Sequence, residues 1–257
     1  MKNVVVVQAR EGSSRLPNKV LKKIKNRTIL ENVVNKCLNL NNVSKIIVAT
    51  TTNSYKIKDI CIENNYEYLE GSESNVLERF TDVIKKYKID NLIRINSDCP
   101  LFDESITQFT IDKYLKHYPN FDYASNTITK SFPQGFDVEI IKANILTNLN
   151  DQSLEKDDYE HVTLYIRKNA NLYKAISILN NEDYGKYRLT IDTESDFEIL
   201  KWISSHYDDI NDIKFDAKLK KILMSSKYQE FNKLFESDSL VNKYSKNKFL
   251  ELLEYNY

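Results

Sequence analysis

Three cations follow a short run of valines near the start of the chain. Val4–Val7 has the composition of a buried strand, and Arg10, Arg15 and Lys19 come soon after it, beside one glycine and two serines. A loop of small residues after a strand can bring backbone N–H groups close to an anion. Each cation at about 4 Å from an opposite charge gains about 4 kcal/mol before desolvation. A triphosphate matches this charge. An ordinary solvated loop is the alternative, since neither G-x-x-x-x-G-K-[ST] nor G-x-G-x-x-G is present.

The elements that would position this loop alternate between strands and helices. Short apolar runs predict strands, and apolar residues at helical spacing predict helices between some of them. This alternation indicates an α/β fold with a mixed, mostly parallel sheet. The predicted strands are Asn3–Gln8, Lys45–Thr50, Tyr66–Leu69, Asn91–Asn96 and Tyr187–Ile191, and the predicted helices are Leu30–Leu40, Val76–Tyr87 and Ile106–His117.

Polar side chains collect where these strands end. Thr50 closes one predicted strand, Asp98 follows another, and Asp192 follows the last. Parallel sheets of this kind bind ligands at the carboxyl ends of their strands. We therefore expect these residues to lie near the cationic loop.

Composition excludes several classes of protein. Lys and Arg together number 37 and balance 37 Asp and Glu, so no global positive field predicts nucleic-acid or membrane binding. The three cysteines and three histidines have no zinc-like spacing, and reduced thiols are expected. No apolar run approaches the length of a membrane span. A cytoplasmic protein is the resulting prediction.

The chain divides into two predicted parts. Residues 1–210 carry the strand–helix alternation, and residues 211–257 have an amphipathic helical pattern with apolar positions that include Leu219, Leu223, Phe231 and Phe235. We interpret the second part as a helical extension, with a further apolar patch at Phe249–Leu253, that packs on the core or on a partner and has no chemistry of its own.

The cationic loop resembles a known signature. "QAREGSSRLPNKVL" (Gln8–Leu21) is similar to the A-R-x-G-S-x-R-L-P-x-K loop of the cytidylyltransferases that activate acidic sugars, the superfamily of CMP-Kdo and CMP-sialic acid synthetases. The sequence of this loop is most similar to that of the branch named for the spore-coat polysaccharide protein SpsF. Further stretches match the family in order: "IIVATT", "EGSESNVLERF", "LIRINSDCPLFD", "SNTITKSFPQGFDVEII", "EHVTLYI" and "RLTIDTESDFEIL". The resemblance covers roughly residues 3 to 200.

The resemblance implies a Rossmann-like three-layer nucleotidyltransferase fold related to GT-A, a homodimer, and a Mg²⁺-dependent transfer of CMP from CTP to an acidic sugar or similar acceptor. It also implies roles for single residues. Arg10, Ser13, Arg15 and Lys19 would hold the triphosphate, and Thr50, Gly71, Ser72 and Arg79 would lie near the nucleoside. Asp98 and Asp192 would bind Mg²⁺, with Arg10, Lys19 and Asp98 carrying the catalysis. The acceptor would meet Asn126, Gln134, Asp137, Glu139, Glu160 and His161.

Some positions depart from the family pattern. Asn75 stands where Asp is common, Tyr159 where Arg is frequent, and Ser195 replaces part of a Pro-Glu-Asp run. Glu11 places an acidic residue beside the phosphate loop. These departures concern the nucleoside and the acceptor more than the triphosphate.

Several residues also have a plain structural interpretation. Asp98 could be a turn residue, and Thr193 could cap a helix whose first turn contains Asp196. His161 could be structural. Asp137 and Glu139 alternate with apolar residues and could form a solvated sheet face. Arg94, inside an apolar strand, is expected to pair with a buried carboxylate.

Two other functions compete with CMP transfer to a precursor of surface polysaccharide. A nucleotide-sugar-dependent glycosyltransferase would need Asp-x-Asp after a central strand, where this chain has Ser97-Asp98-Cys99. A non-catalytic nucleotide-binding protein of a polysaccharide assembly complex would not need Asp98, Asp192 and Lys19, all of which are present.

Overall fold

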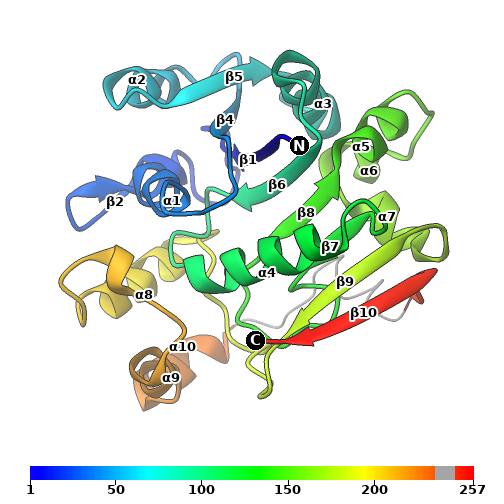
Figure 1. Ribbon diagram of the computed structural model, residues 1–257. Coiled ribbons are helices and arrows are strands. Elements are labelled where there is room, and N and C mark those ends of the chain that lie inside the picture. The colour runs from blue at the N-terminus through cyan, green and yellow to red at the C-terminus, as the bar shows by residue number, and fades with distance from the viewer. Residues whose placement is uncertain (235–246) are drawn as a thin grey trace.

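The computed structural model describes residues 1–234 and 247–257. A mixed sheet in the order β10-β9-β7-β8-β6-β1-β4-β5 runs through the molecule (Figure 1). Its strands are β1 (Asn3–Gln8), β4 (Lys45–Thr51), β5 (Glu67–Gly71), β6 (Asn91–Asn96), β7 (Tyr123–Ser125), β8 (Glu139–Lys142), β9 (Lys174–Leu179) and β10 (Glu251–Asn256). All pairings are parallel except those of β8 with β6 and β7. A hairpin of β2 (Lys23–Ile24) and β3 (Arg27–Thr28) stands apart.

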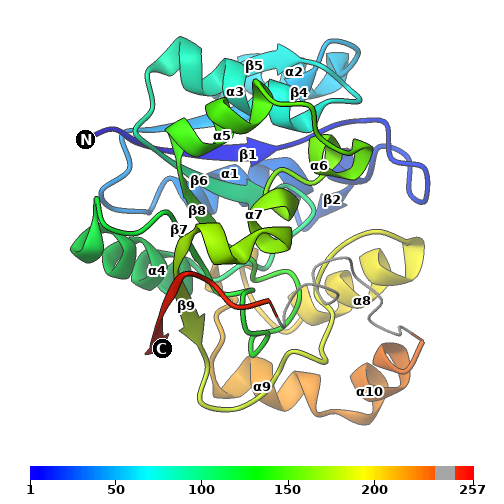
Figure 2. The same ribbon diagram turned by 90° about the vertical axis from the view of Figure 1, so that its right-hand side faces the viewer.

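Helices cover both faces of the sheet (Figures 1 and 2). They are α1 (Ile29–Cys37), α2 (Tyr55–Glu63), α3 (Val76–Tyr87), α4 (Glu104–His117), α5 (Ala143–Asn150), α6 (Lys156–Glu160), α7 (Leu164–Lys168), α8 (Glu194–Ser204), α9 (Ala217–Leu223) and α10 (Ser226–Asn232). The described residues also form the short 3-10 helices η1 (Lys19–Leu21), η2 (Ala170–Leu172) and η3 (Ile210–Asp212).

The all-apolar strand β1 shows why both faces are covered. Val5 and Val7 face a core cluster shared with α1, α4 and α8 to α10, whereas Val4 and Val6 face a second cluster under α3, α5 and α7. Since successive strand residues point to opposite faces, a continuous valine run is what a strand buried on both sides needs. The three-layer α/β fold expected from the sequence is confirmed.

One predicted strand is wrong. Tyr187–Ile191 forms only an isolated bridge, between Arg188 and Gln134. Its backbone instead bonds to several separate partners: Tyr187 O accepts from Gln134 N at 2.9 Å, and Ile191 N donates to Asp98 O at 2.9 Å. The apolar side chains are buried as predicted, but burial alone does not distinguish a strand from an irregular segment.

The predicted C-terminal extension contains the helices α9 and α10, which pack on the same core as α1 and α4. Residues 235–246, including Phe235, lie outside the described part of the chain. The last described segment is a strand that we did not predict, because β10 pairs in parallel with β9 from Glu251 to Asn256. The division at residue 210 remains a prediction.

Cys37, Cys61 and Cys99 are all free and buried. In the described ranges, no helix has the length and apolar character needed to cross a membrane.

Candidate active site

The carboxyl ends of β1 and β6 open onto a pocket of about 280 Å³. The pocket brings together the predicted triphosphate and metal residues with two of the predicted acceptor residues. Its lining consists of Gln8, Arg10, Ser13, Ser14, Arg15, Lys19, Val20, Arg94, Asn96, Ser97, Asp98, Glu160, His161 and Asp192. The predicted triphosphate and metal residues, which come from separate stretches of sequence, therefore line one pocket.

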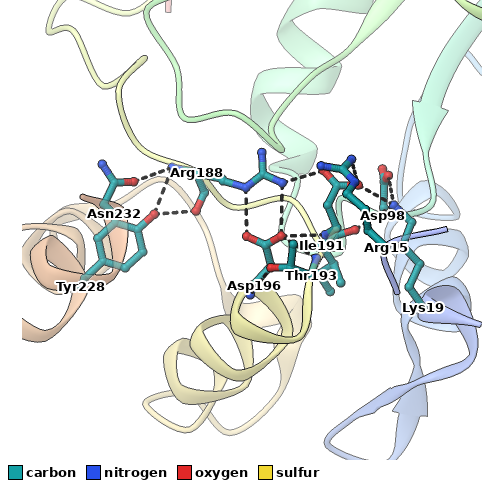
Figure 3. A network of polar contacts seen from close by, with 10 residues as sticks. Arg15, Lys19, Asp98, Arg188, Ile191, Thr193, Asp196, Tyr228 and Asn232 are labelled. Atoms are coloured by element: carbon teal, nitrogen blue, oxygen red, sulfur yellow. Dashed lines mark hydrogen bonds and ion pairs between the residues drawn. The ribbon is translucent and has the colours of Figure 1, made fainter. Parts of the chain in front are cut away.

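Lys19 lines this pocket and contacts Asp98 (Figure 3). Its Nζ donates to Asp98 Oδ2 at 2.6 Å, Asp192 Oδ1 at 2.9 Å and the carbonyl oxygen of Ile191 at 2.8 Å. Burial acts to lower the pKa of Lys19, but the two carboxylates outweigh it and the pKa is raised above its ordinary value. The ammonium group therefore stays charged.

Asp192 contacts cations with both of its carboxylate oxygens. Oδ1 contacts Lys19 and, at 3.0 Å, Arg15, while Oδ2 accepts from Arg188 at 2.6 Å. Burial would raise the pKa of Asp192, but these cations hold it below its usual range. The Asp98 carboxylate contacts Lys19 through Oδ2, and its Oδ1 accepts a hydrogen bond from Cys99 Sγ at 3.5 Å.

The donor set fits a hard divalent cation. Asp98 and Asp192 touch the same ammonium nitrogen, so their oxygens converge on one point. Oxygen ligands of this kind suit Mg²⁺, which keeps several waters and takes one or two carboxylates together with phosphate oxygens. The described residues contain no group of three or more metal-ligating side chains, so phosphate and water would have to complete the shell. Lys19 would have to leave the point between the carboxylates.

The acidic residue in the phosphate loop has a structural role. Glu11 Oε1 accepts from Ile57 N at 3.2 Å, in the first turn of α2, while its carbonyl oxygen accepts from Ser13 N and Asn18 N. An acidic side chain at a helix N-terminus is stabilising. Glu11 thereby closes the loop and is absent from the pocket lining.

The predicted nucleoside residues form a separate group beside the pocket. Thr50 and Gly71 lie on the neighbouring strands β4 and β5, and Ser72 and Arg79 meet through a bond of 2.7 Å from Arg79 Nη1 to Ser72 O. Burial, with Arg10 nearby, lowers the pKa of Arg79 to about 10. Thr50 Oγ1 and Arg79 Nε and Nη2 are buried without a hydrogen-bond partner among the described residues. Such atoms are costly unless something binds them.

The predicted acceptor residues separate into two groups. Glu160 and His161 line the pocket, with Glu160 at 3.9 Å from Arg10. The other four lie outside its lining: Asn126, Gln134, Asp137 and Glu139.

Those four residues have contacts within the protein. Asn126 is buried and joins two backbone groups, donating to Phe136 O and accepting from Val138 N. Gln134 bridges to Arg188 through its backbone. Asp137 is half-buried, and burial raises its pKa to about 6. Glu139 is buried and forms ion pairs with Arg94 and Arg167. It is the buried carboxylate that the sequence predicted as the partner of Arg94.

Capping explains two further positions. Asn75 accepts from Glu78 N and caps α3, a task that Asp also performs. Thr193 and Asp196 form a capping box at α8, as expected.

Sequence reasoning missed Arg188, Tyr228 and Asn232. Arg188 stands four residues before Asp192, a spacing that could have drawn attention to it. No sequence pattern pointed to Tyr228 and Asn232, because they lie on α10, about forty residues after Arg188 in the chain.

Comparison with known proteins agrees with this geometry. A family model described as cytidylyltransferase matches residues 4–237. The spore coat polysaccharide biosynthesis protein SpsF of Bacillus subtilis is 32% identical over 205 residues, which cover 76% of this chain and 83% of that protein. The 3-deoxy-manno-octulosonate cytidylyltransferase of Haemophilus influenzae is 28% identical over 195 residues, covering 74% and 70%. The solved structure of a cytidylyltransferase from Leptospira borgpetersenii superposes with a TM-score of 0.82 at 28% identity, covering 93% of this chain and 100% of that one.

Proposed function

Because the chain belongs to the cytidylyltransferase family and is a CTP-dependent nucleotidyltransferase, we propose that it transfers CMP from CTP to an acidic acceptor. The acceptor would be an acidic sugar or a similar compound, and the reaction would use Mg²⁺ and release pyrophosphate. The product would serve the synthesis of a surface polysaccharide, the process for which the relative SpsF is named. A homodimer and a cytoplasmic location are part of the same proposal.

The contact of Lys19 with Asp98 and Asp192 carries the proposal. A pocket that cleaves a triphosphate needs cations for the leaving pyrophosphate and carboxylates for a hard metal. Arg10, Arg15 and Lys19 are the cations that line this pocket beside those carboxylates. Arg94 adds a fourth, so the positive charges in the lining exceed the three carboxylates and favour polyanionic substrates.

The reaction is an in-line displacement at the α-phosphorus. The acceptor hydroxyl oxygen forms a bond to that phosphorus, and the bond from phosphorus to the oxygen shared with the β-phosphate breaks. The electron pair leaves with pyrophosphate, and the hydroxyl proton passes to water. Little covalent work falls to the protein, so catalysis consists of positioning and charge neutralisation.

The chain's own residues would divide this work. Arg10, Arg15 and Ser13 would hold the β- and γ-phosphates, and Lys19 would follow the charge that develops on the bridging oxygen. Mg²⁺ bound by Asp98 and Asp192 would supply further positive charge at the phosphate oxygens. Glu160 and His161, at the pocket wall, would orient the acceptor.

The test is pyrophosphate release by the purified protein. The four NTPs are crossed with a panel of sugar acids and small phosphorylated acids, with Mg²⁺ present or chelated. Asp98→Asn is assayed in parallel, with Asp90→Asn as the matched control, because the Asp90 carboxylate is half-exposed and contacts the backbone nitrogens of Met1 and Lys2, away from the pocket. Size-exclusion chromatography with light scattering reports the oligomeric state.

We expect release with CTP and one class of acidic acceptor, dependent on Mg²⁺ and lost in Asp98→Asn alone. Release with a neutral acceptor would overturn the acidic-acceptor part of the proposal. Full activity of Asp98→Asn, or activity after chelation, would overturn the metal assignment.

A further inference from the structure

Arg188 is absent from the pocket lining, but it joins the carboxylates of Asp192 and Asp196 (Figure 3). Its Nη2 donates to Asp192 Oδ2 at 2.6 Å and to Asp196 Oδ2 at 3.2 Å, and its Nε donates to Asp196 Oδ1 at 2.9 Å. Asp196 is fully buried and also accepts from the backbone N–H groups of Asp192 and Thr193, both at 2.8 Å. Asp192 is therefore fixed through its backbone and through one carboxylate oxygen, which leaves Oδ1 directed at the pocket.

The backbone of Arg188 is itself held by α10. The Tyr228 hydroxyl accepts from Arg188 N at 3.1 Å and donates to Arg188 O at 2.6 Å. Asn232 Oδ1 accepts from the same N–H at 3.2 Å, and Asn232 Nδ2 donates to Lys186 O at 2.9 Å. Among the described residues this segment has an isolated bridge to Gln134 and no strand neighbour, so the two side chains supply hydrogen bonds that a neighbouring strand would otherwise provide.

Gly135 supports the segment from the opposite side. It has φ +107°, and a Cβ there would lie 2.7 Å from the carbonyl carbon and oxygen of Leu189. Any larger residue would push the segment towards α10. The backbone of Arg188 thus lies between the Gln134–Gly135 turn and the α10 side chains, and it cannot shift without breaking one of these contacts.

We propose that Arg188 is a positioning residue for Asp192 and that α10 holds it in place through Tyr228 and Asn232, so that the C-terminal helices set the geometry of the metal–nucleotide site. This inference rests on the proposed function. It assigns a task to a part of the chain that the sequence left without chemistry. Residues that orient a metal ligand in this way commonly change metal affinity or activity by about 10- to 100-fold when they are replaced.

A lysine cannot replace Arg188. A guanidinium presents several N–H groups in a rigid planar fork, whereas an ammonium is a single point charge on a flexible stem. Arg188→Lys therefore keeps the charge beside Asp192 but loses the bridge to Asp196. Arg27→Lys is the matched control, since Arg27 pairs with Asp209 at 3.3 Å on the exposed surface.

The experiment measures binding of Mn²⁺–CTP without an acceptor, from the enhancement of water proton relaxation when Mn²⁺ is immobilised on the protein. We expect Arg188→Lys to weaken binding by about 10- to 100-fold. Tyr228→Phe removes two backbone hydrogen bonds and should weaken it by about three- to ten-fold. Tyr207→Phe is its control, because the buried Tyr207 hydroxyl has no hydrogen-bond partner among the described residues. Guanidinium at millimolar concentration should partly restore binding in Arg188→Ala, whereas methylammonium should not.

Unchanged Mn²⁺–CTP affinity in Arg188→Lys and Tyr228→Phe, with wild-type binding intact, would overturn the positioning role and leave the proposed function standing. Equal losses in Tyr228→Phe and Tyr207→Phe would also overturn it, since the effect would then reflect general loosening. A wild-type protein that binds CTP in a thermal melt but shows no relaxation enhancement would refute the metal site and this inference together. If Arg188→Lys fails to fold, Tyr228→Phe and its control decide the question.

Discussion

Two networks of charged side chains lie at the same end of the sheet, and they differ in how accessible their charged groups are to water and ligands. In the pocket network, Lys19 is 13% exposed and Asp98 is 28% exposed, so water or a ligand can touch both. In the network around Glu139, the carboxylate is 7% exposed and Arg167 is 3% exposed. Proximity to the pocket is common to both networks, because Arg94 belongs to the second and lines the pocket wall. Access therefore separates the two more clearly than position does.

Both carboxylate oxygens of Glu139 have protein partners, although Arg94 Nε and Arg167 Nε are buried without a hydrogen-bond partner among the described residues. Glu139 Oε2 accepts from Arg94 at 2.5 Å, and Oε1 accepts from Thr163 at 2.8 Å, from Arg167 at 3.4 Å and from the Tyr123 hydroxyl. Burial would raise the pKa of Glu139, but the two arginines and the hydroxyl donors lower it to about 2. A direct bond to an acceptor would require one of these partners to leave. We therefore propose that Glu139 stabilises the fold and that Asp98 and Asp192 hold a ligand.

The largest effect that would test this comparison is on stability. Glu139→Gln keeps the shape but leaves Arg94 and Arg167 without a counter-charge, and breaking a buried pair costs about 3–5 kcal/mol. For a chain of this size we expect the melting temperature to fall by about 10 °C. The matched control is Glu251→Gln, which breaks an exposed pair with Lys174 at 2.7 Å and should shift the melt much less.

The contrary result would restore the role that the sequence suggested for Glu139. If Glu139→Gln melts like the wild type but no longer discriminates between acceptors, then Glu139 contacts the acceptor directly. The Arg94 and Arg167 contacts would then be features of the ligand-free protein.

The second effect is on activity with little change in stability. Lys19→Ala removes the cation from the leaving pyrophosphate, and loss of one such electrostatic contact costs about 10²- to 10³-fold in turnover. The free energy of unfolding should change little, because Asp98 and Asp192 are partly exposed and Arg15 and Arg188 still contact Asp192. Turnover and thermal melts are compared with those of Lys22→Ala, whose amine pairs with Glu194 on the surface at 2.9 Å. Parallel losses of turnover and melting temperature would make Lys19 a structural residue.

The two networks also differ in how much of them could be predicted. The pocket residues stand in short local stretches just after the strands, where small residues and charges interrupt apolar runs. Since parallel strands end at one edge, Arg10 and Asp98 could be expected to converge, and the strands β1 and β6 were predicted with their observed bounds. Asp192 also lines the pocket, but it follows a segment that is not a strand. The exception is Tyr187–Ile191, where an apolar pattern does not specify which backbone groups pair.

The remaining contacts depend on tertiary packing that no local pattern encodes. Glu139 alternates with apolar residues, which allowed a solvated sheet face, but β8 runs antiparallel between β6 and β7 and the Glu139 side chain lies between Arg94 and Tyr123. Tyr228 looked like one more apolar position of an amphipathic helix, and its hydroxyl bonds to Arg188 only after α10 has packed on the core. The strand β10 takes its conformation from the free edge of β9.

Lys36 is a third buried cation, and no carboxylate of the described residues forms a hydrogen bond with it. Lys36 is fully buried on α1, and its Nζ donates to the carbonyl oxygens of Phe102 at 2.9 Å and Ile213 at 3.1 Å. Burial lowers the pKa of Lys36 from 10.5 to about 8, against the weaker opposing effect of Glu104 and Asp103. Lys19, bound to two carboxylates, shows the opposite shift. The nearest counter-charge therefore decides the sign of the shift.

The lowered pKa of Lys36 gives the smallest predicted effect, which is a dependence of protein stability on pH. Above pH 8 the native protein loses the Lys36 proton, while the unfolded chain keeps it until about pH 10.5, so the free energy of unfolding should rise with pH in this window. Between pH 7.5 and 9.5 the gain should be about 1–2 kcal/mol relative to Lys36→Met, measured by urea unfolding of both proteins. The buried thiols of Cys37, Cys61 and Cys99, whose pKa values burial raises, act in the opposite direction. Both proteins contain them, so their contribution cancels in the difference. Lys19 does not change the pH dependence of stability in this window, because the stabilisation from its raised pKa is lost only above pH 10.5.

The contrary result is a difference in the free energy of unfolding between wild type and Lys36→Met that does not change with pH. It would mean that water or Glu104 reaches the Lys36 amine. Burial without a bound carboxylate would then not be what distinguishes Lys36 from Lys19.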